Sequence, residues 1–336
     1  MHTGRKFAVL VAAVAVVLAT TVWLPLYAVA PGGARSVEPL IHVTGHPEYR
    51  SQGKFVMTSV EFSQLTALGA FLAWLDPNQS VVSRSEIYAP GETSEEARRR
   101  SISQMDQSKL DAAYVVLSEL TEYPKDHRPG AIIESVVPGC AADGRLYPGD
   151  LIRSIDGERI GGVSAASRAI EAAPSGSSLT FEISAGGDVH RVSLVREPCG
   201  GQKEPLVGVR LISNFPFRVW IESGDVGGPS AGLMWSLGLY DVLTPGDLTG
   251  GRMIAGTGQI GLDGTIYPIG GIEEKIVAAE RAGAVVFLVP QGNYAAARAV
   301  SDGAEEDGIE LVPVSDFEEA LEYLLDELAG PESADR

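Results

Sequence analysis

Ser230 is the residue of this chain whose surroundings first suggest chemistry. It lies in the run Gly-Pro-Ser-Ala-Gly at residues 228–232, which leads into the apolar stretch 233–237. Proline fits the first turn of a helix because its missing N–H is not needed there, so the run predicts a helix with Ser230 at its start. Free backbone N–H groups and the positive end of the helix dipole would then lie beside the hydroxyl, where they could hold an oxyanion. The alternative is a serine that only caps a helix.

A nucleophilic serine needs a base, because an unassisted hydroxyl is too weak a nucleophile. Residues 228–232 also fit G-x-S-x-G, the nucleophile turn of α/β-hydrolases, in which an acid and then a histidine follow the serine. All five histidines of this chain precede Ser230, which excludes that order. The only lysine after Ser230 is Lys275, which is therefore the candidate base.

The residues around Lys275 have the pattern of an amphipathic helix over 270–283, closed by a glycine. On a helical wheel, Lys275 lies at the centre of the apolar stripe. The stripe consists of Ile272, Ala278, Ala279 and Ala282. An inward lysine without a carboxylate partner loses hydration, so its pKa falls from about 10.4 and the neutral amine can accept a proton. Lowering the pKa to about 7 costs roughly 4–5 kcal/mol, which a structural residue would rarely justify. The alternative is a lysine whose stem packs while its ammonium reaches water.

Residues 206–325 resemble the proteolytic domain of Lon-type proteases, which use a Ser–Lys dyad. The matching segments are GPSAG at 228–232, GTGQI at 256–260, YPIGG at 267–271, EKI at 274–276, AA at 278–279, and VP at 289–290 followed by Asn293. The resemblance implies that Ser230 is the nucleophile, Lys275 the general base and Thr257 a supporting hydroxyl that orients Lys275. Gly227 departs from the pattern, because many Lon proteases carry an acidic residue there. Asp225 is not in register with that position, so no auxiliary acid is assigned.

The N-terminal part of the chain is apolar. Residues 7–33 contain no charged side chain, and residues 7–24 are long enough to span a bilayer. Arg5 and Lys6 precede this stretch, so the positive-inside rule keeps the N-terminus in the cytoplasm and sends the rest across. We therefore expect a single-pass membrane anchor with the catalytic part outside the cytoplasm. A cleaved signal peptide that ends near residues 28–30 is the alternative.

The segments that follow the apolar part have weaker signals. Residues 54–61 alternate as a strand does. Residues 65–75 are apolar but too short to cross a membrane, so they belong to a core or lie at a bilayer interface with Trp74. Residues 90–124 predict a helix that is capped by Thr93 or Ser94.

A second resemblance, to PDZ domains, covers residues 125–200. Its motifs are GAIIESVVPGCAA at 130–142, LYPGDLI at 146–152 and IDG at 155–157. The pattern further predicts a helix over 163–173 and strands over 179–184 and 190–194. PDZ domains add a peptide strand to an open sheet edge beside a helix. No Gly-Leu-Gly-Phe-like carboxylate loop occurs in residues 123–129, so binding of free C-termini and a purely structural or gating role both stay open.

The two cysteines, Cys140 and Cys199, lie near the two ends of this second domain. An oxidising compartment would allow a bridge between them, and two unpaired buried cysteines are the alternative.

Other classes of function are excluded or disfavoured. The formal net charge of −18 argues against nucleic acid as a direct partner. Residues 256–261 spell G-x-G-x-x-G, but no helix can follow directly, so a dinucleotide site fails. His42 and His46 have metal-like spacing without a helix or further ligands, so we expect no metal and no cofactor. No G-x-x-x-x-G-K-[ST] motif occurs, so the chain carries no P-loop ATPase.

We therefore expect an α+β multi-domain protein with an N-terminal transmembrane helix, a PDZ-like β-rich domain and a C-terminal Lon-type α/β proteolytic domain. The expected divisions are a cytoplasmic tip and anchor (1–33), an extracytoplasmic region with a helical segment (34–124), the PDZ-like domain (125–200) and the proteolytic domain (205–330). The expected function is ATP-independent endopeptidase action on extracytoplasmic polypeptides. Because Lon domains commonly form rings, the resemblance also implies a homo-oligomer, with a hexamer as the expected size. The competing hypothesis is a PDZ-type adaptor whose Lon-like domain is an inactive assembly module.

Overall fold

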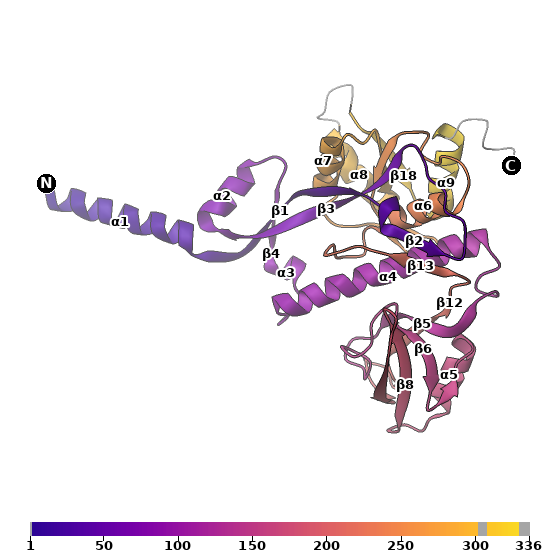
Figure 1. The fold of residues 1–336 in the computed structure, drawn as a ribbon. Coiled ribbons are helices and arrows are strands. Elements are labelled where there is room, and N and C mark those ends of the chain that lie inside the picture. The colour runs from indigo at the N-terminus through magenta and orange to yellow at the C-terminus, as the bar shows by residue number, and fades with distance from the viewer. Residues whose placement is uncertain (1, 302–307, 329–336) are drawn as a thin grey trace.

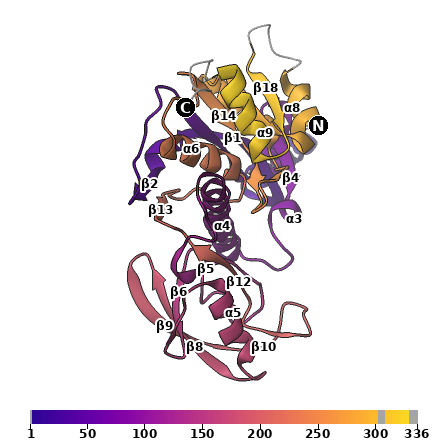
Figure 2. The same ribbon diagram turned by 90° about the vertical axis from the view of Figure 1, so that its right-hand side faces the viewer.

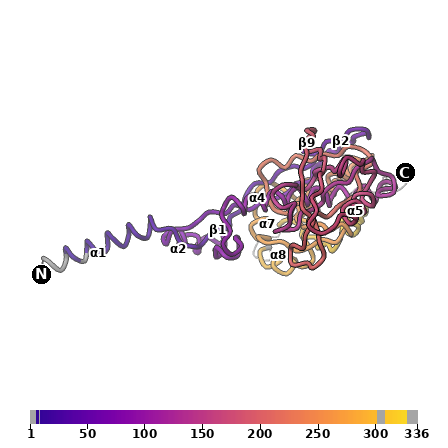
Figure 3. The backbone as a smooth tube through the Cα atoms, turned by 90° about the horizontal axis from the view of Figure 1, so that it is seen from below, coloured from indigo at the N-terminus to yellow at the C-terminus, as the bar shows by residue number. Residues whose placement is uncertain are grey.

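A computed structural model describes residues 2–301 and 308–328 of the chain. Figure 1 shows two lobes that meet along the long helix α4 (Ser94–Leu120), with a narrow N-terminal extension on one side. The extension consists of helix α1 (His2–Thr21), the outer parts of strands β1 (Trp23–Ser36) and β3 (Lys54–Thr66), and helix α2 (Ala67–Leu75). Figure 3 shows from below how far this extension projects from the two lobes.

The larger lobe is built on one six-stranded sheet with the order β18-β17-β14-β3-β1-β4. Its other strands are β4 (Ser80–Ser83), β14 (Met253–Gly256), β17 (Val286–Pro290) and β18 (Glu310–Val314). Strand β14 runs parallel to both β3 and β17, and β1 runs antiparallel to β3 and β4. The strand expected over 54–61 is therefore the inner part of β3. Residues of the expected region 34–124 and of the expected domain 205–330 share this sheet, so the larger lobe is not confined to 205–330.

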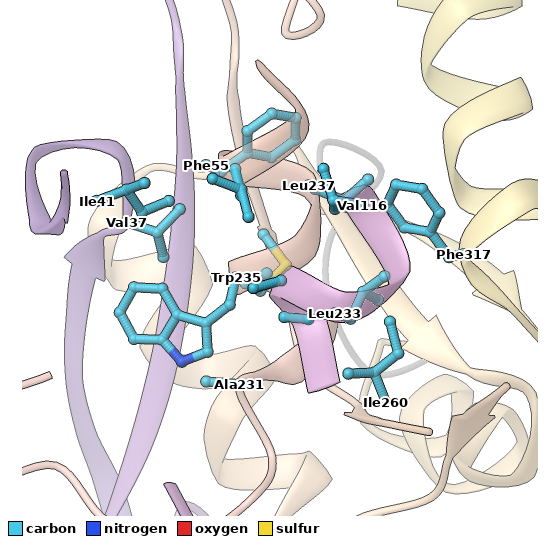
Figure 4. Packing of buried hydrophobic residues seen from close by; sticks show 14 of the residues in the cluster. Val37, Ile41, Phe55, Val116, Ala231, Leu233, Trp235, Leu237, Ile260 and Phe317 are labelled. Carbon is cyan, nitrogen blue, oxygen red and sulfur yellow. The ribbon is translucent and has the colours of Figure 1, made fainter. Parts of the chain in front are cut away.

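Helices cover both faces of this sheet because successive side chains of a strand point to opposite faces. Phe55 of β3 lies in the core beneath helix α6 (Gly232–Leu243), whereas Val56 lies in the core beneath helix α7 (Ile272–Ala282). Figure 4 shows the first of these cores, in which Trp235 and Leu233 of α6 meet side chains of the N-terminal segment. The Nε1 atom of Trp235 lies 3.3 Å from Sδ of Met105, which places α4 against α6.

Smaller elements complete the larger lobe. They are η1 (Glu38–Leu40), β2 (Ile41–Thr44), α3 (Arg84–Ile87), β13 (Arg218–Ile221), β15 (Gln259–Ile260), β16 (Ile266–Tyr267), η2 (Gln291–Asn293), α8 (Tyr294–Ser301), α9 (Phe317–Tyr323) and η3 (Leu324–Leu328). Strand β2 pairs with β13, and β15 pairs with β16.

Helix α4 begins after Thr93, one of the two expected caps. The Thr93 side chain accepts a hydrogen bond from the backbone N–H of Glu96, and the Glu96 carboxylate accepts one from the backbone N–H of Thr93. This reciprocal capping satisfies two backbone donors at the start of the helix. The helix ends at Leu120, within the expected range 90–124.

The smaller lobe is a second sheet with the order β12-β5-β6-β8-β9, and β7 pairs with β6. Its strands are β5 (Arg128–Val136), β6 (Leu151–Ile155), β7 (Glu158–Arg159), β8 (Ser178–Ala185), β9 (Asp188–Val195) and β12 (Val209–Asn214), and a short ladder joins β10 (Glu197–Pro198) to β11 (Pro205–Leu206). Helix α5 (Val163–Ala172) is the helix expected over 163–173. Because β12 pairs with β5, the smaller lobe continues to residue 214, beyond the expected boundary at 200.

The two cysteines form a disulfide. The bond joins Cys140 to Cys199, so the bridged alternative holds and the unpaired one is wrong. It fixes the segment after β9 to the turn that follows β5.

The N-terminal extension does not support the expected membrane anchor. Across residues 2–301 and 308–328, no helix combines the length and the apolar character that crossing a membrane requires. The apolar stretch expected over 65–75 forms the end of β3, where Leu65 is buried, and helix α2, in which Ala73 is the buried residue. Trp74 is 74% exposed, so the core interpretation of this stretch is wrong for most of its side chains.

Candidate active site

Ser230 lies in a turn that precedes helix α6, not in the helix. The helix begins at Gly232, and the residue before it, Ala231, has φ −96° and ψ 3°, outside the helical range. The expectation that Pro229 opens the helix with Ser230 at its start is therefore wrong, because the helix begins two residues after Ser230. Ser230 is half-buried, so its hydroxyl stays accessible from the cleft beside it.

Lys275 lies on helix α7, as the sequence pattern predicts. Glycines in the left-handed region delimit the helix, with φ 70° at Gly271 and φ 84° at Gly283. A side chain at Gly271 would also collide with Val60, since a Cβ atom there would lie 2.9 Å from its Cγ1. Lys275 is only 3% exposed, so its whole side chain, ammonium included, is inside the protein. The alternative of a lysine that reaches water is wrong.

The fold brings the three expected site residues together. Nζ of Lys275 lies 2.6 Å from Oγ of Ser230 and 2.9 Å from Oγ1 of Thr257. Burial lowers the pKa of Lys275 to about 7, because the low-dielectric interior disfavours the charged amine. The amine can therefore be neutral near pH 7 while it lies within hydrogen-bond distance of the serine hydroxyl.

Thr257 contacts both the lysine and the backbone of the serine. Its hydroxyl donates to the carbonyl oxygen of Ser230 at 2.9 Å and accepts from Nζ of Lys275. The backbone N–H of Gly258 donates to the same carbonyl at 2.8 Å. Residues 257–258, directly after β14, thus hold the turn of residues 228–231, which we call the serine turn, from the side of the sheet.

Helix α4 fixes the serine turn from the other side. The backbone N–H of Gly228 donates to the carbonyl oxygen of Ser101 at 2.8 Å, and Oγ of Ser108 donates to the carbonyl oxygen of Pro229 at 2.9 Å. Neither of these two serines was expected to contact the site. More than a hundred residues separate them from Ser230, and no local pattern indicates which turn they will contact.

A second unexpected contact holds helix α7. The carboxylate of Glu274, the residue before Lys275, accepts a hydrogen bond from Oγ of Ser80 at 2.6 Å. Glu274 is buried, and Ser80 belongs to β4. The first part of α7, which carries the lysine, is therefore tied to the N-terminal segment.

The structure also explains the departure at Gly227. A Cβ atom at this position would lie 2.3 Å from Oγ of Ser101, so helix α4 occupies the space that a larger residue would need. Asp225 does not replace the missing acid. Its carboxylate is almost fully exposed and lies 3.3 Å from Nη2 of Arg98 in a surface ion pair, away from the lysine.

The dyad opens into a cleft of about 1250 Å³. Its walls come from β1, β3, α4 and the serine turn, and the buried Lys275 adjoins it next to Ser230. Within the described ranges, no three His, Cys, Asp or Glu side chains gather closely enough to hold a metal ion. The side chains that the structure does gather are those of an amine-assisted serine nucleophile.

Comparison with known families agrees with this geometry. Residues 216–327 match the family model of the Lon protease (S16) C-terminal proteolytic domain, and residues 132–184 match the PDZ domain. The chain therefore contains a Lon-type proteolytic domain, which lies in the larger lobe, and a PDZ domain, which lies in the smaller lobe. The expected presence of both domains is confirmed.

Individual relatives that match part of the chain are Lon proteases. The chain is 36% identical over 114 residues to Lon protease 2 of Bacillus subtilis (strain 168), and this covers 33% of the chain and 18% of that protein. It is 29% identical over 147 residues to the Lon protease of Rickettsia typhi, covering 42% of the chain and 18% of that protein. The chain thus spans less than a fifth of these relatives.

A solved structure matches the smaller lobe. The PDZ domain of the SdrC-like protein from Listeria innocua is 22% identical and covers 24% of the chain and 92% of that domain, with a TM-score of 0.22.

Proposed function

We propose that this chain is an endopeptidase that cleaves polypeptides with a Ser230–Lys275 dyad. The observation that carries the proposal is the 2.6 Å approach of a buried lysine amine to the hydroxyl of a half-buried serine in a cleft. In the first step the neutral amine of Lys275 takes the proton from Ser230 as its Oγ attacks the peptide carbonyl. The resulting ammonium then gives this proton to the leaving amine, and an acyl-enzyme remains on Ser230.

Water completes the reaction. The neutral amine of Lys275 takes a proton from a water molecule that attacks the acyl-enzyme, and the proton returns to Oγ of Ser230 as the ester breaks. Backbone N–H groups at the turn that leads into α6 are the donors that would hold the oxyanion in both steps. Thr257 orients Lys275 throughout, because its hydroxyl bridges Nζ and the carbonyl of Ser230.

The substrate is proposed to be an extended polypeptide that the PDZ lobe helps to recruit. Strand β12 is an edge strand of the PDZ sheet, and helix α5 packs beside it. Addition of a peptide strand at such an edge is the usual way in which PDZ domains bind. An extended chain is also the conformation that can enter the cleft beside the dyad.

The competing function is that of a PDZ-type adaptor with an inactive Lon-like domain. A domain that had lost its activity would not need a buried, unpaired lysine amine, because burial of the charge opposes folding. The retained contacts of Lys275 with Ser230 and Thr257 favour the enzyme.

The test is covalent labelling by a serine-directed phosphonate. We expect the intact protein to be labelled at Ser230 and to cleave an unfolded polypeptide, and we expect Ser230→Ala and Lys275→Ala each to abolish both. Ser175→Ala and Lys125→Ala, which change an exposed serine of a PDZ-lobe turn and an exposed lysine, are the matched controls. Unchanged cleavage by both dyad variants would refute the assignment. Tight peptide binding without any labelling would favour the adaptor.

Location, energy requirement and assembly are further parts of the proposal. We place the catalytic part outside the cytoplasm, supported by the Cys140–Cys199 disulfide and by the apolar segment 7–24 behind Arg5 and Lys6. Cleavage is proposed to need no ATP, since these 336 residues contain no P-loop motif. A homo-oligomer, with a hexamer as the expected size, follows from the likeness to Lon proteases. Accessibility to an added protease in intact cells, assays without nucleotide and light scattering test the three points in turn.

A further inference from the structure

Helix α4 is the element through which the two lobes meet. Figure 2 views it almost along its axis, with the sheet of the larger lobe above it and the PDZ lobe below. The helix lies outside both matched regions, 216–327 and 132–184. Its side chains nevertheless contact the serine turn on one side and a strand of the PDZ lobe on the other.

On the active-site side, α4 holds two backbone groups directly before the nucleophile. The carbonyl of Ser101 accepts the N–H of Gly228, and Oγ of Ser108 donates to the carbonyl of Pro229 in the peptide group that joins it to Ser230. Ser108 is 2% exposed, so water does not compete for this hydrogen bond. A shift of α4 relative to the sheet would therefore move the peptide group to which Ser230 is attached.

On the PDZ side, Gln107, the residue before Ser108, makes a hydrogen bond to the PDZ lobe. Nε2 of Gln107 donates to Oε1 of Glu134 on strand β5 at 2.7 Å. Glu134 is 4% exposed, and the buried carboxylate of Asp111 lies in the same cluster. Oγ of Ser135 donates to the other carboxylate oxygen of Glu134. A buried carboxylate that loses one of its donors is costly, so the Gln107 contact resists separation of β5 from α4.

The two contacts are mechanically linked because Gln107 and Ser108 are consecutive residues of one helix. Consecutive helical residues point about 100° apart around the axis, so one can face the PDZ lobe while the other faces the serine turn. Movement of β5 that pulls on Gln107 therefore also acts on Ser108.

We propose that the PDZ lobe sets the reactivity of Ser230 through α4, with Gln107 and Ser108 as positioning residues. The inference rests on the proposed peptidase function. A PDZ lobe that holds Gln107 in place keeps Ser108 on the carbonyl of Pro229 and the hydroxyl of Ser230 within reach of Lys275. Displacement of β5 relative to α4 lowers turnover because it moves the peptide group that carries Ser230.

The experiment compares Gln107→Ala, Ser108→Ala and the double variant in the full chain. The measurements are the rate of phosphonate labelling of Ser230 and kcat and KM for an unfolded polypeptide. We expect each single variant to lower labelling and kcat about fivefold, the loss typical of one hydrogen bond, with KM unchanged. The double variant is expected to lose little more than either single one, because both act on one linked element. Ser103→Ala on the same helix is the matched control and is expected to be neutral.

Two further variants separate this mechanism from a loss of folding. Glu134→Gln keeps a carbonyl oxygen as the acceptor for Gln107 and is expected to retain at least half of the labelling rate, whereas Glu134→Ala is expected to match Gln107→Ala. Labelling at the wild-type rate in Gln107→Ala, or multiplicative losses in the double variant, would overturn the proposal. If Ser230→Ala were labelled as fast as the natural chain, the peptidase assignment itself would fail, which is a different result.

Discussion

The buried amine of Lys275 should make this protein less stable than a variant that lacks it. Burial lowers the pKa of Lys275 to about 7, whereas an unfolded lysine has a pKa of about 10.4. At about 1.36 kcal/mol per pH unit, the folded state loses roughly 4–5 kcal/mol at pH 7 and below from this residue alone. Lys275→Met removes the ionisable group and keeps a side chain of similar length.

The sign of the effect depends on pH in a defined way. Below pH 7 the lysine is charged in both the folded and the unfolded state, so the loss of unfolding free energy is constant. Between about pH 7 and 10 the unfolded state binds more protons, so stability rises with pH, and above about pH 10 the loss has vanished. Lys275→Met also loses the hydrogen bonds to Ser230 and Thr257, worth roughly 1 kcal/mol each. The variant is therefore expected to be about 2–4 kcal/mol more stable at pH 6 and no more stable at pH 10.

Urea unfolding at pH 6, 8 and 10 measures this difference, with Lys125→Met at an exposed site as the control. A Lys275→Met variant that is less stable than the natural chain at pH 6 would refute the reasoning. So would a gain that is the same at all three pH values.

The same pKa predicts the pH dependence of the chemistry. With a pKa of about 7, half of the amine is neutral at pH 7 and about 1% at pH 5, so phosphonate labelling of Ser230 should rise about fiftyfold between these values. Lys275→Arg stays charged throughout and is expected to show no such rise. A labelling midpoint above pH 9 would contradict a neutral amine at pH 7.

Three further predictions follow from contacts around the site. Thr257→Val should lower kcat about 10- to 100-fold because it removes both the acceptor for Lys275 and a donor to the serine turn, whereas Thr257→Ser should retain most activity in the same kinetic assay. Burial, and then the negative charge of Glu134, raises the pKa of Asp111 to about 8, so the stability that the protonated Asp111 contributes is lost as the pH rises from about 4 to 8. Asp111→Asn should therefore be roughly 1–3 kcal/mol more stable than the natural chain at pH 9 and nearly as stable at pH 4. Equal curves of melting temperature against pH for the two proteins would count against this. Gly227→Ala should slow labelling at least tenfold because its Cβ meets Oγ of Ser101, and Ser101→Ala in the same chain should restore part of the rate; a fully active Gly227→Ala would show that the turn does not need this close contact.

Local pattern placed Lys275 correctly, whereas its pairing with Ser230 as a dyad came from the resemblance to Lon-type proteases. The wheel of residues 270–283 put Lys275 on the apolar face, and the structure buries it there because that face packs on the sheet. The helix start after residue 229 was misplaced, since the turn that carries Ser230 is held by long-range hydrogen bonds and not by helix geometry. A proline and a cap-like serine are compatible with both arrangements, so sequence could not decide between them.

The set of chain segments that form the larger lobe could not be predicted in the same way. Strand β3 pairs in parallel with β14, although almost two hundred residues separate them, and the PDZ lobe lies between them in the chain. Periodicity predicts a strand over 54–61 but carries no information about its partner. The role of α4 was missed for the same reason, because its contacts with the serine turn depend on how two distant segments fold together.

The pairing of β14 with β3 predicts which segments of the chain the larger lobe needs in order to fold. A fragment of residues 205–336 covers the whole match to the Lon proteolytic domain but lacks β1, β3 and α4. Strand β14 would then have no neighbour on the side where β3 pairs, and the core would lose the side chains that the N-terminal segment contributes to it. Those include Val37, Phe55, Met105, Val116 and Leu117.

Each such side chain stabilises the folded state by roughly 1.5–3 kcal/mol when buried, so the loss of five removes about 8–15 kcal/mol, as much as the whole stability of a typical domain. We therefore expect the fragment to show no cooperative thermal transition and no labelling at Ser230, whereas the full chain shows both. Addition of a separate chain of residues 22–124 should restore labelling, because it supplies β1, β3 and α4 together. A fragment that unfolds cooperatively and reacts at the rate of the full chain would show that the N-terminal strands are an accessory to the peptidase and not part of it.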